Sequence, residues 1–124
     1  MGATIKVSCT ACRFYKELNV GSGLMDCQPE FIMKRLNENE KNKFRQVLDM
    51  GAIRTVLIQK ACVCGSCGEL YSVKTVNYYL NNKSAEIRGV CPKCSSAEVR
   101  FIDNAAPCPV CGEELTFQKT GFWD

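Results

Sequence analysis

Eight of the ten cysteines in this chain fall into four Cys-x-x-Cys pairs, and no other sequence feature constrains the fold as strongly. Two intervening residues let both sulfurs of one tight turn reach one ion, and two such turns complete the tetrahedral shell of a structural zinc site. The sequence therefore predicts two four-thiolate sites and two zinc ions per chain. The pairs are Cys9/Cys12, Cys64/Cys67, Cys91/Cys94 and Cys108/Cys111.

The length of 124 residues suits one domain or two small lobes nucleated by metal. A unit below about 40 residues usually needs a disulfide or a metal ion to fold alone. The chain has no apolar run of the roughly 18 residues needed to span a membrane, and its first residues lack the features of a secretion signal. We therefore expect a cytoplasmic protein with reduced thiols, in which a cysteine-rich pattern indicates metal binding.

The pattern of apolar residues predicts a mostly β chain with one helical insertion. The insertion has a polar stretch at 37–43, so it is either one helix with a solvated middle or two shorter helices. Asp26 or Gln28 could cap its start, and Gly51 is expected to end it. In chain order we expect a strand at 3–8, a strand around 14–20, a break at 21–23, the helical insertion at about 29–50, strands at 53–63 and 70–80, an exposed turn at 81–84, a strand around 99–101, a turn at 103–107 and a short strand at 115–117.

The spacing of the pairs favours two zinc ribbons that follow one another along the chain. The short interval between the third and fourth pairs suits two strands and a turn, which leaves the first pair to join the second. The alternative joins the second pair with the third and the first with the fourth, and it also satisfies every cysteine. The sequential hypothesis places site 1 at Cys9, Cys12, Cys64 and Cys67 in a first lobe, 1–82, and site 2 at Cys91, Cys94, Cys108 and Cys111 in a second lobe, 83–124.

The residues around the pairs also favour metal binding. Gly68 and Gly112 each follow a pair, where a left-handed glycine lets backbone amides turn toward the sulfurs. These turns, here called knuckles, resemble those of zinc ribbons and rubredoxins. Over its whole length the chain resembles small bacterial zinc-ribbon proteins of unknown function, through its leading pair, the segment 21–25, a helix, and a strand ending at 64–68. That resemblance implies a metal-stabilised cytosolic protein with sequential pairing of the knuckles.

The chemistry of the thiolates leaves the identity of the metal open. Tetrahedral sulfur sites accept both zinc and iron, so rubredoxin-like electron transfer by iron is an alternative to structural zinc. Thioredoxin-like dithiol chemistry would need one activated pair on a βαβ scaffold, which the predicted ribbons do not supply. The two unpaired cysteines, Cys27 and Cys62, are each predicted to be small buried hydrophobic residues. Cys62 should point to the same side of its strand as Cys64, where it could instead be a fifth thiol near the metal.

Charge gives only weak support to a nucleic-acid partner. The formal charge is +3, but eight thiolates and two divalent ions together would bring the loaded protein to about −1. Basic residues are concentrated in 34–60, where a solvated helix face is the commoner interpretation. The residues that would bind nucleic acid are Lys34, Arg35, Lys41, Lys43 and Arg45.

The chain has no histidine, so the commonest general base in enzymes is missing. Catalytic zinc also keeps an open position, which all-cysteine sites lack. We therefore expect a non-enzymatic binding or adaptor module, with protein partners ahead of nucleic acid. Several other features have two interpretations. The segment 21–23 is interpreted as a turn rather than an anion cradle, and the tyrosines Tyr71, Tyr78 and Tyr79 as strand residues rather than base-stacking ones, while Phe122 and Trp123 either pack on the body or form a docking peptide.

Overall fold

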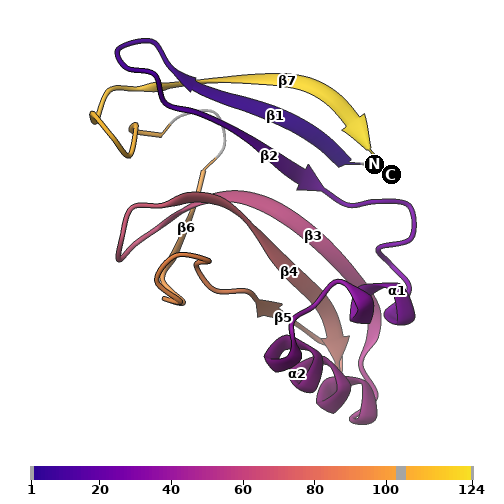
Figure 1. Cartoon of the computed structure of the whole chain (residues 1–124). Coiled ribbons are helices and arrows are strands. Elements are labelled where there is room, and N and C mark those ends of the chain that lie inside the picture. The colour runs from indigo at the N-terminus through magenta and orange to yellow at the C-terminus, as the bar shows by residue number, and fades with distance from the viewer. Residues whose placement is uncertain (1, 103–105, 124) are drawn as a thin grey trace.

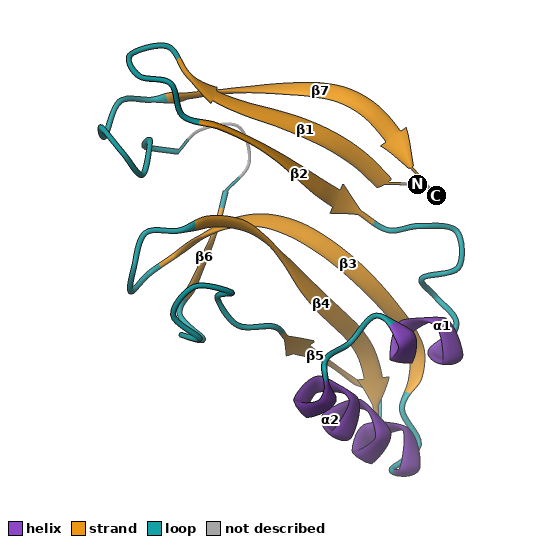
Figure 2. Cartoon of the chain, viewed as in Figure 1, coloured by secondary structure: helices purple, strands orange, loops and turns teal. Residues whose placement is uncertain are grey.

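The computed structural model describes residues 2–102 and 106–123. In this part of the chain seven strands and two short helices form a mostly β fold, which confirms the predicted class (Figures 1 and 2). The predicted turn at 103–107 lies partly outside the described residues. The elements are β1 (Gly2–Cys9), β2 (Tyr15–Gly21), α1 (Pro29–Lys34), α2 (Glu38–Asp49), β3 (Ile53–Cys64), β4 (Leu70–Leu80), β5 (Lys83–Arg88), β6 (Val99–Phe101) and β7 (Leu115–Trp123).

The strands pair antiparallel in the order β5-β4-β3-β2-β1-β7, and β6 also pairs with β3. The connection between β2 and β3 is a single paired position, Gly21 with Gln59. The sheet is therefore divided into two leaves, which Figure 1 shows one above the other. We call β2, β1 and β7 the terminal leaf, and β3, β4, β5 and β6 the central leaf.

Both leaves take strands from either side of residue 82, so the predicted lobes 1–82 and 83–124 are not separate units. β7 pairs with β1 from Cys9–Leu115 to Gly2–Trp123, and β6 pairs with the end of β3. The predicted boundary at 81–84 is instead a tight hairpin turn. Asn81 and Asn82 have φ values of 53° and 64°, the left-handed pair that a two-residue hairpin loop requires. The central leaf is thus enclosed, in sequence, by the two halves of the terminal leaf.

Two of the three apolar clusters in the described residues hold these layers together. The first lies between the leaves, where Val7 and Leu18 of the terminal leaf pack with Ala61 and Leu70 of the central leaf. The second lies under the helices. Its members Ile32, Leu36, Phe44, Leu57, Val76 and Ile87 come from α1, the loop after it, α2, β3, β4 and β5.

The helical insertion is two helices because Asn37 begins a new one. Its side chain accepts a hydrogen bond from the backbone of Glu40, whose side chain accepts one from the backbone of Asn37, forming a capping box. Gly51, with a φ of 101°, follows α2 as expected. Neither predicted cap acts through its side chain at α1. Gln28 is the N-cap without a side-chain bond, and Asp26 instead accepts from the backbone of Gly23 and from Arg35.

The two C-terminal aromatic residues both lie in β7 but differ in exposure. The indole nitrogen of Trp123 donates a hydrogen bond of 3.1 Å to the carbonyl oxygen of Ala3. A β-carbon on Gly2 would collide with the Trp123 ring, so only glycine permits this approach. Trp123 therefore packs on the body of the protein, whereas Phe122 is 69 % exposed.

We expect Phe44→Ala to lower the free energy of unfolding of the metal-loaded protein by about 3–5 kcal/mol, because Phe44 is fully buried beneath the helices. The matched control Phe122→Ala should change it by less than about 0.5 kcal/mol, because that ring is exposed. Chemical denaturation followed by circular dichroism measures both. Equal effects of the two variants would contradict the placement of the second core.

Candidate metal centres

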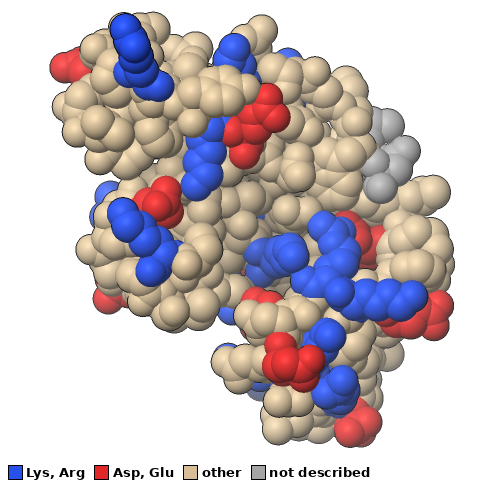
Figure 3. Space-filling view, viewed as in Figure 1, with Lys and Arg blue, Asp and Glu red and all other residues tan. Residues whose placement is uncertain are grey.

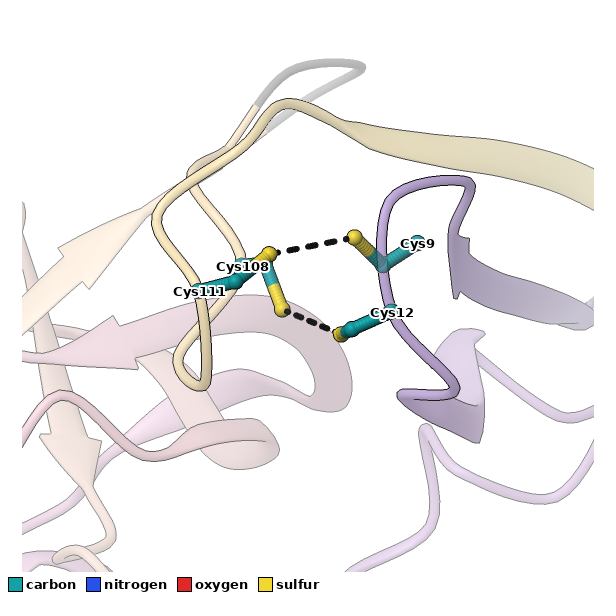
Figure 4. Close-up of side chains that lie close together, drawn as sticks. All are labelled: Cys9, Cys12, Cys108 and Cys111. Carbon is teal, nitrogen blue, oxygen red and sulfur yellow. Dashed lines mark hydrogen bonds between the residues drawn. The ribbon is translucent and has the colours of Figure 1, made fainter.

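The first group of four thiols lies at one end of the terminal leaf and brings together an N-terminal and a C-terminal segment of the chain (Figure 4). The Cys9 and Cys12 knuckle connects β1 to β2, and the Cys108 and Cys111 knuckle precedes β7. Cys9 Sγ lies 3.5 Å from Cys111 Sγ, and Cys12 Sγ lies 3.7 Å from Cys108 Sγ. We call these four residues the terminal-leaf cluster.

The second group repeats this arrangement in the central leaf. The Cys64 and Cys67 knuckle connects β3 to β4, and the Cys91 and Cys94 knuckle precedes β6. Cys64 Sγ lies 3.5 Å from Cys94 Sγ, and Cys67 Sγ lies 3.6 Å from Cys91 Sγ. These four residues form the central-leaf cluster. In both clusters all four sulfurs lie within 4.8 Å of one another.

These separations fit a metal ion and do not fit disulfides. A tetrahedron of sulfurs at the zinc–sulfur distance of about 2.3 Å has edges of about 3.8 Å, close to the 3.5–3.7 Å found here. A disulfide would bring two sulfurs to about 2.05 Å. Each cluster can therefore hold one ion. The donor set of four sulfurs is suited to zinc and to iron alike.

The grouping of the knuckles differs from the sequential hypothesis. Cys9 and Cys12 face Cys108 and Cys111 rather than Cys64 and Cys67, and the inner two knuckles face each other. Strand pairing is the physical reason. β1 runs into its knuckle beside the start of β7, with Cys9 opposite Leu115, and β3 does the same beside β6, with Cys64 opposite Val99. The hypothesis was wrong because the short interval between the third and fourth pairs does not form a closed ribbon.

All four knuckles share one backbone hydrogen bond. In each, the amide of the first cysteine donates to the carbonyl oxygen five residues later, at 2.6–3.1 Å. The donors and acceptors are Cys9 and Phe14, Cys64 and Glu69, Cys91 and Ser96, and Cys108 and Glu113. This bond closes the turn so that the third residue after the first cysteine returns its sulfur toward the same point. The two sulfurs of each Cys-x-x-Cys pair therefore point toward the same position, as two ligands of one ion must.

Three of the knuckles also turn amides toward a sulfur. Cys64 Sγ accepts from the amides of Ser66 and Cys67, and Cys91 and Cys108 each accept from the amide two residues later, all at 3.4 Å. The predicted left-handed glycines, Gly68 and Gly112, have φ values of 78° and 83°. Such amides favour the thiolate form that a metal needs.

Sequence reasoning missed the third left-handed position, which is Ser95 with a φ of 62°. Its place four residues after Cys91 matches that of Gly68 after Cys64, and this shared spacing is the signal that could have identified it. The first knuckle has Arg13 at the equivalent position, and Arg13 is not among the residues with positive φ. This knuckle is therefore the one that departs from the common form.

The clusters divide their thiols into more and less acidic members. The amide of Cys67 lowers the pKa of Cys64 to about 6, against the opposing effect of burial. Burial raises the pKa of Cys108, but the amides of Cys111 and Val110 outweigh it and lower the pKa to about 7. For Cys94 the backbone of Ser96 lowers the pKa, yet hydrogen bonding with Cys64 and burial raise it to about 12. One buried thiol in each cluster is therefore prepared to ionise first.

The two unpaired cysteines have different environments. Cys62 is fully buried with Cys64, Tyr71 and Cys91, and its thiol donates to the carbonyl oxygen of Tyr71 at 3.4 Å. Burial raises the pKa of Cys62, and the central-leaf cluster is complete without it. Cys62 is thus the predicted buried residue rather than a fifth ligand. Cys27 is exposed in the loop before α1, so its predicted burial is wrong.

The candidate nucleic-acid residues lie on the helices or, for Arg35, directly after α1, and several have acidic or polar partners. Figure 3 shows Lys and Arg side chains gathered over the helical part of this face with Asp and Glu side chains among them. The pairs are Arg35 with Asp26, Lys41 with Glu38 at 3.6 Å, and Arg45 with Asn42 at 3.2 Å, whereas Lys34 lies over the ring of Phe31 and Lys43 is exposed. Of the three tyrosines, Tyr71 is buried as predicted, Tyr78 is half-buried, and Tyr79 is 41 % exposed.

Comparison of the chain with protein-family models, with curated proteins and with solved structures found no match. The helices of the described residues are all too short or too polar to cross a membrane.

Paired cysteine substitutions separate the two groupings by metal content. Cys9→Ser with Cys111→Ser removes two ligands from the terminal-leaf cluster alone, so we expect about one zinc per chain to remain. Cys9→Ser with Cys64→Ser damages both clusters, so both ions should be lost after washing with a mild chelator. Elemental analysis of zinc per chain gives the answer. The reverse pattern would restore the sequential grouping.

Proposed function

We propose that two structural zinc ions fold this chain into a non-catalytic binding module. One observation carries the proposal: each cluster closes four thiols around one point, and each joins turns from distant parts of the chain. Four protein ligands leave no coordination position for water or substrate. Binding of structural zinc supplies about 10–16 kcal/mol of apparent free energy in small domains, which is as large as their whole stability.

The size of the cores supports a folding role for the metal. Between the leaves the fully buried large side chains are few, and cysteines of the terminal-leaf cluster, Cys9 and Cys108, are themselves part of that core. The leaves are joined through β2 and β3 at only one paired position. An ion in each cluster would stabilise such a fold, because one ion would hold the knuckles beside β1 and β7 together and the other those beside β3 and β6.

A protein partner is the class that we propose first for the module, in keeping with an adaptor role. A pocket of ≈ 380 Å³ lies between α1 and the end of β7. Its apolar lining includes Met25, Phe31 and Trp123, and the neighbouring Leu24 is 74 % exposed. Apolar side chains gathered at one place on a small surface favour a protein contact.

Rubredoxin-like electron transfer is the second candidate, because three knuckles direct amides at sulfur as iron–thiolate sites do. The relevant acceptors are Cys64, Cys91 and Cys108. Freshly purified protein would then be red, with visible charge-transfer absorption. A colourless protein with two zinc ions per chain excludes this candidate.

Removal of the metal should unfold the protein. A strong chelator is expected to abolish the β-sheet circular dichroism and to shift the emission of Trp123 to longer wavelength, because the indole packs on Gly2 only in the folded chain. Readdition of zinc should reverse both changes. An unchanged fold after complete metal loss would contradict the proposal that the metal is structural.

The adaptor role predicts that protein partners depend on the pocket beside α1. Met25→Ser should lose proteins that the unmodified chain retains in a pull-down, because Met25 lines that pocket. Met50→Ser is the matched control, since Met50 is 66 % exposed but lies after α2, outside the pocket lining. Identical sets of retained proteins for both variants and the unmodified chain would count against a protein partner at this surface.

A further inference from the structure

The two faces of the central leaf have different surroundings. Residues on β3 and β4 alternate between faces, and the pair Leu57 with Val76 points toward the helices. The next pair, Val56 with Asn77, therefore points to the opposite face, which the helices do not cover. Both residues are only partly buried. The end of this face near the β4–β5 turn is thus partly open, whereas Val73 and Cys62, farther along the same face, are buried.

This open face carries cations placed over aromatic rings. Arg54 lies 5.6 Å from the ring centre of Tyr79, while Lys60 and Arg88 lie 5.0 Å and 4.8 Å from that of Phe101. Both rings are more than 40 % exposed. We call these five residues the cation–aromatic face.

Hollows connect the two rings along the sheet. A pocket of ≈ 280 Å³ shares Arg54 and Tyr79 with a pocket of ≈ 600 Å³, which also reaches Lys60. Lys60 in turn lines a pocket of ≈ 530 Å³ together with Phe101. A linear ligand following these pockets would pass from one ring to the other with a cation at each step.

The charge of this face is less compensated than that of the helices. The carboxylate among the residues lining these three pockets is Glu86, and it is paired with Arg88. In the described part of the chain, Arg54 and Lys60 form no salt bridge. By contrast, α2 carries three acidic residues against three basic ones. The helices that the sequence suggested are therefore a poorer site for a polyanion than the sheet.

We propose that the cation–aromatic face binds single-stranded nucleic acid, with phosphates at Arg54 and Lys60 and bases stacked on Tyr79 and Phe101. Basic grooves interleaved with exposed aromatic rings recognise single strands because every base has a face that can stack. Base pairs inside a duplex do not expose those faces, so a duplex would contact only the cations.

The length of the face suits a short segment of such a strand. The distance between the two rings can be measured along β3, because Tyr79 of β4 pairs with Ile53 and Phe101 of β6 pairs with Cys62. Nine residue steps of an extended strand span at most about 30 Å. A site of this length lies at the small end of the roughly 4 to 16 nucleotides that single-strand-binding folds cover. The lining also includes Asn77 and Ser84, polar groups that suit a nucleotide better than an apolar peptide.

This inference needs the folded sheet but not the adaptor role, and the test uses the zinc-loaded full chain. The probe is a fluorescently labelled 12-nucleotide oligo-dT, and its binding is followed by anisotropy from low to moderate salt. Tyr79→Leu and Phe101→Leu should each weaken binding about 5- to 150-fold with little change in salt dependence. Lys60→Gln should instead reduce the slope of log affinity against log salt by about 0.7.

Lys43→Gln is the matched control, because Lys43 is an exposed lysine on α2 away from this face, and it should leave binding unchanged. Circular dichroism and zinc content are measured on the same samples, so a folded, zinc-loaded protein that fails to bind overturns this inference alone. Equal affinity for single strands and duplex, or weakening by Lys43→Gln rather than by Tyr79→Leu, would also overturn it. The inference would also be overturned if unlabelled nucleic acid failed to displace the probe while a protein bound at the same face displaced it.

Discussion

The convergence of four thiols on one point, achieved twice, is the constraint on which the rest of the structure depends. Sulfurs only 3.5–3.7 Å apart would repel one another strongly if they were all thiolates with no cation between them. A divalent ion removes that repulsion, and backbone amides at three knuckles lessen it further. The antiparallel pairs β1–β7 and β3–β6 both reach the knuckles, where this charge has to be balanced, so metal binding and strand pairing would stabilise each other.

This coupling separates the two ends of the molecule. In Figure 1 the knuckles lie at one end of the leaves, and the helices and the two termini lie at the other. Each cluster would carry a charge of about −2 with one divalent ion bound, whereas the open face of the central leaf carries Arg54, Lys60 and Arg88. The cation–aromatic face runs between these two ends, because Tyr79 pairs with Ile53 at the start of β3 and Phe101 pairs with Cys62, two residues before Cys64.

Much of the local structure follows from short-range patterns. The strands at 53–63 and 70–80 and the left-handed Gly68 and Gly112 were predictable because apolar alternation and knuckle geometry act within a few residues. β5 was not predicted, because residues 83–86 are all exposed and have no apolar alternation, and the strand forms only against β4. Cys27 was placed wrongly for a similar reason, since a single apolar residue in a loop carries no information about which side faces solvent.

The sequence by itself determined that eight thiols would form two four-ligand sites, because two-residue spacing makes every pair a local chelate. It did not determine which pairs meet. Both groupings satisfy every cysteine, and the choice depends on strands that are distant in the chain. Only the tertiary structure decided it, by pairing β1 with β7 and β3 with β6, which nests the central leaf between the two halves of the terminal leaf. The physical reason is that hydrogen bonding along a nine-residue strand such as β7 outweighs the entropic cost of closing a long loop, which grows only slowly with loop length.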